Sequence, residues 1–219
     1  MDNLSLQTLC EGIMRVRQNA SALLEDARLL RRNNRIPRAY ATAYMACEEA
    51  GKLSILIGAA TRVVIDVPVD WKSTRKRFRS HDSKASQFMG LARGIPVIQE
   101  AVAAKGQVVD SKLMLAKAAA GAVVGPTLFT NRNASLYCDF LDGSFTSPNE
   151  QISEEMADQM IECAELHIDV ANVTLGATAE EAAKRITERW SRQRYDSMMS
   201  QVSETADLMQ MALSMLHTP

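Results

Sequence analysis

The chain has 219 residues, of which 47% are hydrophobic and 23% charged, and its formal net charge is −1. These values are ordinary for one soluble globular domain. The sequence also argues against a membrane protein, because no apolar run reaches the roughly 18 residues that a membrane span needs. Aromatic residues make up only 5% of the chain, and glycine and proline are few, which favours helix over sheet.

The cysteines and the first residues bear on the compartment. The four cysteines are far apart and form no CxxC pair. The opening stretch MDNLSLQTLCEG lacks the features of a signal peptide. Together these features predict reduced thiols in a cytoplasmic protein.

The charges are distributed unevenly. Residues 1–132 carry 20 Lys and Arg against 11 Asp and Glu, whereas residues 133–183 carry 11 acids and no Lys or Arg. Such blocks can be solvated faces. Alternatively, the basic half meets a polyanion, or the acidic segment pairs with the basic half within one chain or in a dimer.

The first half of the chain predicts three helices. Apolar residues at three- and four-residue spacing predict an amphipathic helix over about 6–30. Residues 37–64 are apolar or small almost all round, which predicts a buried central helix. A third helix is expected from about Asp70 to Ala92, and a shorter one as far as about residue 105.

The second half begins irregularly. Residues around 106–150 form a loop-rich insertion, and the pattern then predicts helices over about 153–175 and from Thr178 toward the carboxyl end. The expected product is a single all-α domain over residues 1–219, an up-and-down helical bundle.

Three charged residues interrupt the apolar central helix. Glu48 and Lys52 have the spacing and order of a helical ion pair. Glu49 falls on the apolar seam, so it must face a partner on another helix or line a cavity. One interpretation is a buried ion pair that fixes the helix register, and the other is the wall of a polar site inside the bundle.

The stretch STRKRFRSHDSKASQF, residues 73–88, is strongly basic. On a continuous helix His81 falls on the apolar seam between Phe78 and Ala85, so it would point inward while Arg79 points elsewhere. Arg77 and Lys84 would lie on an adjoining face. A lone histidine on such a seam is more often a satisfied core residue, but a carboxylate of the central helix could contact it.

A third polar cluster, TNRNASLYCDF, lies in the irregular segment and contains Arg132, Asn133, Tyr137 and Asp139. Positioned polar side chains in such segments are usually functional or capping. The chain has no P-loop, no HExxH motif and no nucleophile elbow. With three dispersed histidines we expect no metal site and no cofactor, and we expect His167 to be structural.

Three stretches resemble one known family when taken in order. RIPRAYATAYMACEEAGKL, FRSHDSKASQF and NRNASLYCDF, followed by SPNEQISEE, are similar to the AbiV family of bacterial abortive-infection proteins, which belongs to the HEPN superfamily of helical bundles. The resemblance covers roughly residues 15–175. It implies a HEPN-like fold and a role in phage defence. It also implies that the chain is a metal-independent ribonuclease that dimerises and builds its site at the dimer interface, as many HEPN members are.

The HEPN signature is an arginine, usually followed by a polar residue, with a histidine four to six residues later. Arg132 and Asn133 match its first half, but Tyr137 takes the place of the histidine. Arg75 and His81 satisfy the spacing on an earlier helix. Tyrosine has a pKa near 10 and is a poor base at neutral pH.

The resemblance therefore implies His81 as the acid and base of RNA cleavage. Arg132 would bind phosphate together with Arg79 or the nearby Arg77, and Asn133 and Tyr137 would position the substrate. Glu48 and Glu49 would orient His81 or a partner cation.

The expected partners are RNA as substrate, a second copy in a homodimer or higher homo-oligomer, and a phage-encoded activator or cognate regulator. Two alternatives stay open. One is a non-catalytic HEPN module that binds a phage or host protein, and the other is a helical scaffold whose charge blocks drive oligomerisation.

Overall fold

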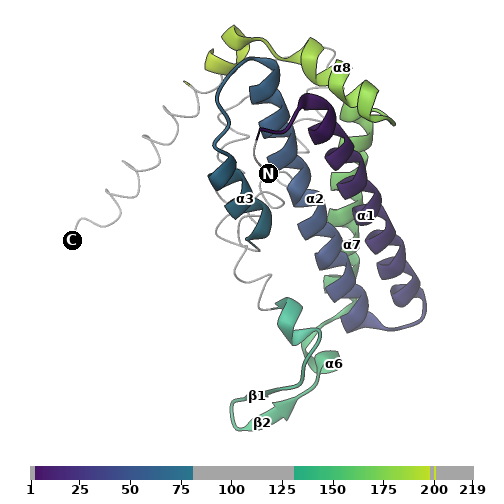
Figure 1. Ribbon diagram of the computed structural model, residues 1–219. Helices are drawn as coiled ribbons and strands as arrows, with labels where there is room; N and C mark the ends of the chain where they lie inside the picture. The colour runs from purple at the N-terminus through teal and green to yellow at the C-terminus, as the bar shows by residue number, and fades with distance from the viewer. Residues whose placement is uncertain (1–2, 81–130, 198–199, 201–219) are drawn as a thin grey trace, which may run out of the picture.

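The computed structural model describes residues 3–80, 131–197 and 200. Three long helices form the body of the molecule and lie side by side in Figure 1. They are α1 (Leu6–Arg32), α2 (Ile36–Val64) and α7 (Glu154–Leu175). The predicted all-α bundle is confirmed, and the predicted bounds of these three helices are correct to within a few residues.

Helix α2 is the centre of the bundle. It contacts α1, α7, α3 (Trp71–Arg79), α8 (Ala179–Arg189) and the short α6 (Pro148–Gln151). Alanines on several of its faces are fully buried, which lets neighbouring helices approach closely. The prediction of a buried central helix is therefore confirmed.

Ion pairs join α1 to α7 across the bundle. Arg31 binds the Asp158 carboxylate through Nε at 2.6 Å and Nη2 at 3.0 Å, and Nη2 also contacts Glu154 at 2.9 Å. One turn earlier, Arg28 contacts Glu165 at 2.6 Å. The acidic segment thus pairs with the basic half within one chain, as one of the three interpretations of the charge blocks predicted.

The corner between α7 and α8 is tied to α1. Gly176 ends α7 with a φ of +80°, a conformation that favours glycine. Arg17 donates to the Gly176 carbonyl at 2.5 Å and to the Ala177 carbonyl at 3.2 Å. Thr178 then caps α8 by accepting from the Glu181 amide at 3.1 Å, as the capping pattern predicted.

Two predicted helices end earlier than expected. Helix α3 ends at Arg79 and Ser80 is extended, so the predicted helix is interrupted at Ser80, and the rest of that prediction, as far as Ala92, lies outside the described residues. Five cations without an intervening acid favour a helix end here, where the helix dipole offers partial negative charge. Helix α8 ends at Arg189, and the chain becomes helical again at 192–197.

Part of the predicted loop-rich insertion is an antiparallel hairpin of β1 (Asp139–Leu141) and β2 (Ser144–Thr146). Asp142 and Gly143 form its turn, both with positive φ. The hairpin projects beyond the end of the bundle in Figure 1. The predictions for residues 81–130 and 201–219 lie outside the described residues.

None of the helices in the described part of the chain has the length and apolar character that a membrane span requires.

Ala43 tests the close packing of α2. Its side chain is completely buried, so Ala43→Leu forces extra methyl groups into a filled core and should lower the free energy of unfolding by about 1–3 kcal/mol. Urea unfolding measures this. Met45→Leu, at a 40% exposed position of the same helix, is the control and should change stability by less than about 0.5 kcal/mol. Equal effects of the two substitutions would contradict this packing.

Candidate functional site

A polar stripe runs along one side of the buried helix α2. Tyr40, Tyr44 and Glu48 follow one another at four-residue intervals, which places them on neighbouring positions of one face. All three are buried. A buried polar side chain needs partners, so this stripe determines what packs against it.

The segment that contains Arg132 packs against this stripe. Residues 131–134 are helical, and the Arg132 guanidinium carbon lies 5.8 Å from the centroid of the Tyr44 ring. Arg132 Nη2 donates to Asn133 Oδ1 at 3.0 Å. The buried Ser135 hydroxyl donates to the Arg132 carbonyl at 2.5 Å and closes the turn. The predicted pair Arg132 and Asn133 is therefore held in a defined place beside α2.

Burial controls the protonation of the two tyrosines. Burial, and then the negative charge of Glu48, raise the pKa of Tyr44 well above its usual value, and the Arg132 guanidinium partly opposes this. Burial raises the pKa of Tyr40 to about 12, partly offset by Asn131. In the described part of the chain no group has the geometry of a well-formed hydrogen bond to either hydroxyl. Both tyrosines are neutral at physiological pH.

Lys52 pairs with a different carboxylate from the one predicted. Its Nζ lies 2.5 Å from Oε2 of Glu49, whereas the sequence predicted a pair with Glu48. Lys52 Nζ also lies 5.1 Å from the centroid of the Phe78 ring of α3, so the lysine is held on the side of α2 that α3 covers. Glu48 instead acts on Tyr44. The expected Glu48–Lys52 pair is thus replaced by a Glu49–Lys52 pair.

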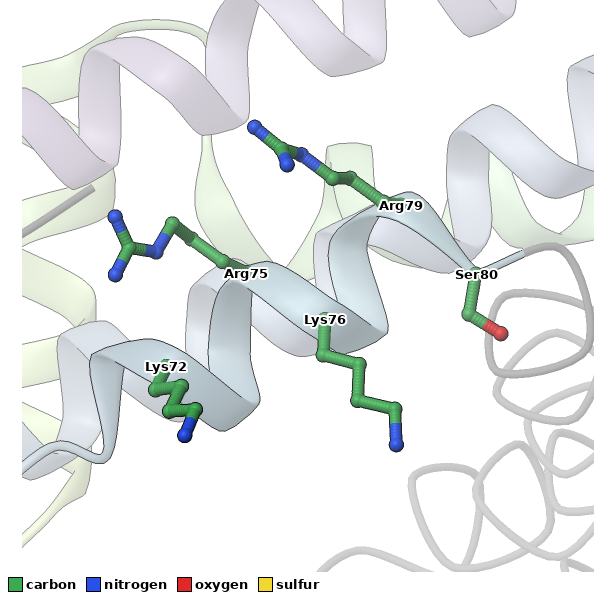
Figure 2. A pocket seen from close by; sticks show the side chains of 5 residues that line it. All are labelled: Lys72, Arg75, Lys76, Arg79 and Ser80. Carbon is green, nitrogen blue, oxygen red and sulfur yellow. The ribbon is translucent and has the colours of Figure 1, made fainter.

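Helix α3 turns a basic face outward. Asp70 caps it by accepting from the Ser73 amide at 2.9 Å, Thr74 is buried, and the partly buried Trp71 and Phe78 pack on the core. The opposite side lines a pocket, drawn in Figure 2, whose residues are Lys72, Arg75, Lys76, Arg79 and Ser80. Like charges at these spacings destabilise a helix by about 0.2–0.5 kcal/mol per pair. The core contacts of α3 therefore hold together a cluster of cations that repel one another.

Two other predicted residues of the basic stretch, His81 and Lys84, lie outside the described residues. The predicted inward orientation of His81 depends on a continuous helix, and α3 ends two residues before it. The inward orientation of His81 stays a prediction. Arg77, the remaining predicted residue of the stretch, is exposed and is not part of the pocket.

Tyr137 and Asp139 lie at the base of the hairpin. Tyr137 is 66% exposed, and its amide donates to the Asn133 carbonyl at 3.0 Å. The Asp139 carboxylate accepts from the Phe140 amide at 2.8 Å, a local capping contact. The backbone thus connects Tyr137 to the Arg132 turn, while its ring faces outward.

His167, which was expected to be structural, is buried on α7. Its Nδ1 lies 2.8 Å from the Cys163 carbonyl, one turn earlier on the same helix. Within the described part of the chain, no group of three or more His, Cys, Asp or Glu is placed to hold a metal ion.

Three residues of the site were not predicted from the sequence: Tyr40, Tyr44 and Ser135. The signal for the two tyrosines was present in RAYATAYMACE, where polar groups recur every fourth residue of an otherwise apolar helix. Ser135 offered no signal, because its role depends on how the Arg132 turn folds.

The family is decided by one comparison. A family model described as AbiV, of the HEPN class, matches residues 8–169, about three quarters of the chain. This chain belongs to the AbiV family of HEPN domains. The match includes α1, α2, α3, the hairpin and most of α7, and it leaves out α8. No curated protein and no solved structure matches the chain.

Membership in the AbiV family links the chain to abortive infection, a form of bacterial defence against phage. The predicted family and the HEPN-like helical fold are therefore confirmed. The Arg132 turn, α3 and the stripe on α2 all lie within the residues that the AbiV model matches.

Because the two tyrosines are buried, we expect the free energy of unfolding to fall at high pH. Unfolded tyrosines lose their protons near pH 10, whereas folded Tyr40 keeps its proton to about pH 12. The folded state then binds more protons than the unfolded state, so the free energy of unfolding falls as the pH rises above about 10. Urea unfolding between about pH 8 and 11.5 measures this fall.

The variant Tyr40→Phe/Tyr44→Phe isolates the contribution of the two hydroxyls. Burial also raises the pKa of Cys47, so part of the fall persists in the variant. The variant should nevertheless lose stability less steeply than the wild type above about pH 10. Identical pH dependences would show that the two hydroxyls are not held neutral by the fold.

Proposed function

We propose that this AbiV-family domain is an effector of abortive infection that cleaves RNA without a metal ion and shuts down translation in the infected cell. The proposal rests on the family and on one observation in particular. The Arg132–Asn133 pair, the first half of the HEPN signature, is held against the Tyr44 ring of the central helix. An arginine fixed in this way is preorganised to bind a phosphate.

The proposed reaction uses the RNA itself as nucleophile. The 2′-hydroxyl oxygen attacks the adjacent phosphorus, the bond from phosphorus to the 5′-oxygen breaks, and the products are a 2′,3′-cyclic phosphate and a 5′-hydroxyl. His81 would take the proton from the 2′-hydroxyl and return a proton to the leaving oxygen. Arg132 and Arg79 would bind the phosphate oxygens as negative charge develops.

Asn133 and Tyr137 would position the substrate. Asn133 orients the Arg132 guanidinium through its side-chain oxygen at 3.0 Å. The exposed ring of Tyr137 is available to a partner outside the domain. A second copy that covers this face would complete the site, which supports the proposal of a homodimer or higher homo-oligomer.

A second candidate function is a non-catalytic HEPN module that binds a phage-encoded activator, a cognate regulator or a host protein. The position of Tyr137 favours it, because a tyrosine stands where the signature has a histidine. In this case Arg132 and Glu48 stabilise the bundle, and the exposed hairpin carries the interaction.

Expression of variants followed by total-RNA analysis separates the two functions. His81→Ala should abolish growth arrest and reduce RNA cleavage by about 10²–10⁴-fold, because it removes the acid and base. Arg132→Lys should also reduce cleavage, because lysine keeps the charge but loses the planar fork. Lys184→Ala, at an exposed position of α8, is the control and should behave as the wild type.

The folded state of each variant is checked by circular dichroism and thermal unfolding. Growth arrest without RNA cleavage by the wild type would reject the ribonuclease and favour the binding module. Full cleavage by a folded His81→Ala variant would reject the proposed role of His81.

A further inference from the structure

The outward face of α3 is cationic, and the reaction proposed above uses only one of its four cations, Arg79. Lys72, Arg75, Lys76 and Arg79 are three or four residues apart in sequence, so they occupy an arc of about 100° on one side of the helix. They line one pocket with Ser80. Figure 2 shows Arg75 and Arg79 directed toward one edge of α3, and Lys72 and Lys76 toward the other.

The positive charge of this pocket is not neutralised by the helix itself. Helix α3 contains five Lys and Arg and no Asp or Glu. For Lys72, Lys76 and Arg79 the described residues supply no ion pair, and the nearby carboxylate of Glu49 is taken by Lys52 at 2.5 Å. A pocket with this excess of cations fits a ligand with several negative charges.

The favourable interaction of cations with the carboxyl end of a helix explains part of this cluster. It applies to the last turn, and therefore to Lys76, Arg77 and Arg79. It does not explain Lys72, which lies in the first turn, where a cation is unfavourable. The helix end therefore accounts for only part of the cluster.

The position of α3 relates this pocket to the Arg132 turn. Phe78, near the end of α3, lies over Lys52, and Arg132 lies over Tyr44, so both segments contact the same helix α2. Lys52 and Tyr44 are eight residues apart, or about 12 Å along the helix axis. In Figure 1 α3 runs along α2 toward the end of the bundle where residues 131–146 begin.

We propose that the outward face of α3 binds the phosphate backbone of a single-stranded RNA and guides it toward Arg132. This inference rests on the proposed ribonuclease function and assigns Lys72, Lys76 and Arg79 to the binding of the substrate. Arg75 and Arg79 form one row of cations, and Lys72 and Lys76 form the other (Figure 2). The two members of each row are about 6 Å apart along the helix axis, a spacing that suits consecutive phosphates of an extended strand. Contacts of this kind read charge and not base sequence.

The salt dependence of binding tests the proposal. A short labelled 2′-O-methyl RNA, which cannot be cleaved, is titrated at KCl concentrations from about 50 to about 200 mM. Each phosphate contact to a single strand contributes about 0.7 to the slope of log affinity against log salt. The triple variant Lys72→Gln/Lys76→Gln/Arg79→Gln should therefore lower the slope by about 2, and it should weaken binding equally for oligo(A) and oligo(U).

A matched variant controls for net charge. Arg15→Gln/Lys184→Gln/Arg189→Gln removes three exposed charges from α1 and α8, and it should bind like the wild type. Glutamine has about the helix propensity of lysine and arginine, so α3 should remain folded, which thermal unfolding checks.

Three results would overturn the proposal. The first is an unchanged slope in the α3 variant, and the second is an equal decrease of the slope in the control variant. The third is binding of polyglutamate but not RNA, which would identify an acidic protein as the partner. Because the probe is not cleaved, these results are independent of the RNA-cleavage assay. Absence of RNA cleavage by the wild type, together with the expected change of slope in the α3 variant, would reject the ribonuclease and leave the RNA-binding surface.

Discussion

The burial of α2 is the constraint on which the rest of the structure depends. The buried side of a helix that contacts five others has no water available for its polar side chains, so each of these needs a partner inside the protein or costs free energy. Tyr44 and Glu48 point along one face, and Glu49 and Lys52 satisfy each other beside α3. The Arg132 turn and α3 thus occupy the places where α2 presents polar groups. The same physical requirement that stabilises the core also positions the candidate site.

The long helices could be predicted from the sequence because their signals are local. An apolar period of three and four residues identifies α1, the lack of a polar face identifies α2, and Gly176 marks the end of α7. The end of α3 at Arg79 could not be predicted in this way, because the apolar period continues past it. The hairpin had a usable signal in the sequence Asp142–Gly143, the preferred pair for a tight turn, within a segment that otherwise looks irregular.

The candidate site was predictable in its residue types but not in its contacts. Arg132 and Asn133 were expected to act together, and they are joined by a hydrogen bond. The packing of Arg132 on Tyr44 joins residues 88 positions apart, and no local pattern reports such a contact. Likewise, Glu48 and Glu49 are both within reach of Lys52 on a helix, and the sequence alone does not show that Lys52 lies beside Phe78 of α3 and pairs with Glu49.

The hairpin beyond the end of the bundle has a consequence for how this domain changes over evolution. Phe140 and Phe145 pack edge to face on each other, with ring centroids 5.0 Å apart, yet their exposed fractions are 58% and 82%. Side chains this exposed contribute little to the stability of the bundle, so substitutions there cost the fold little. The exposed surface of the hairpin can therefore vary in sequence while α2 and its polar stripe stay unchanged.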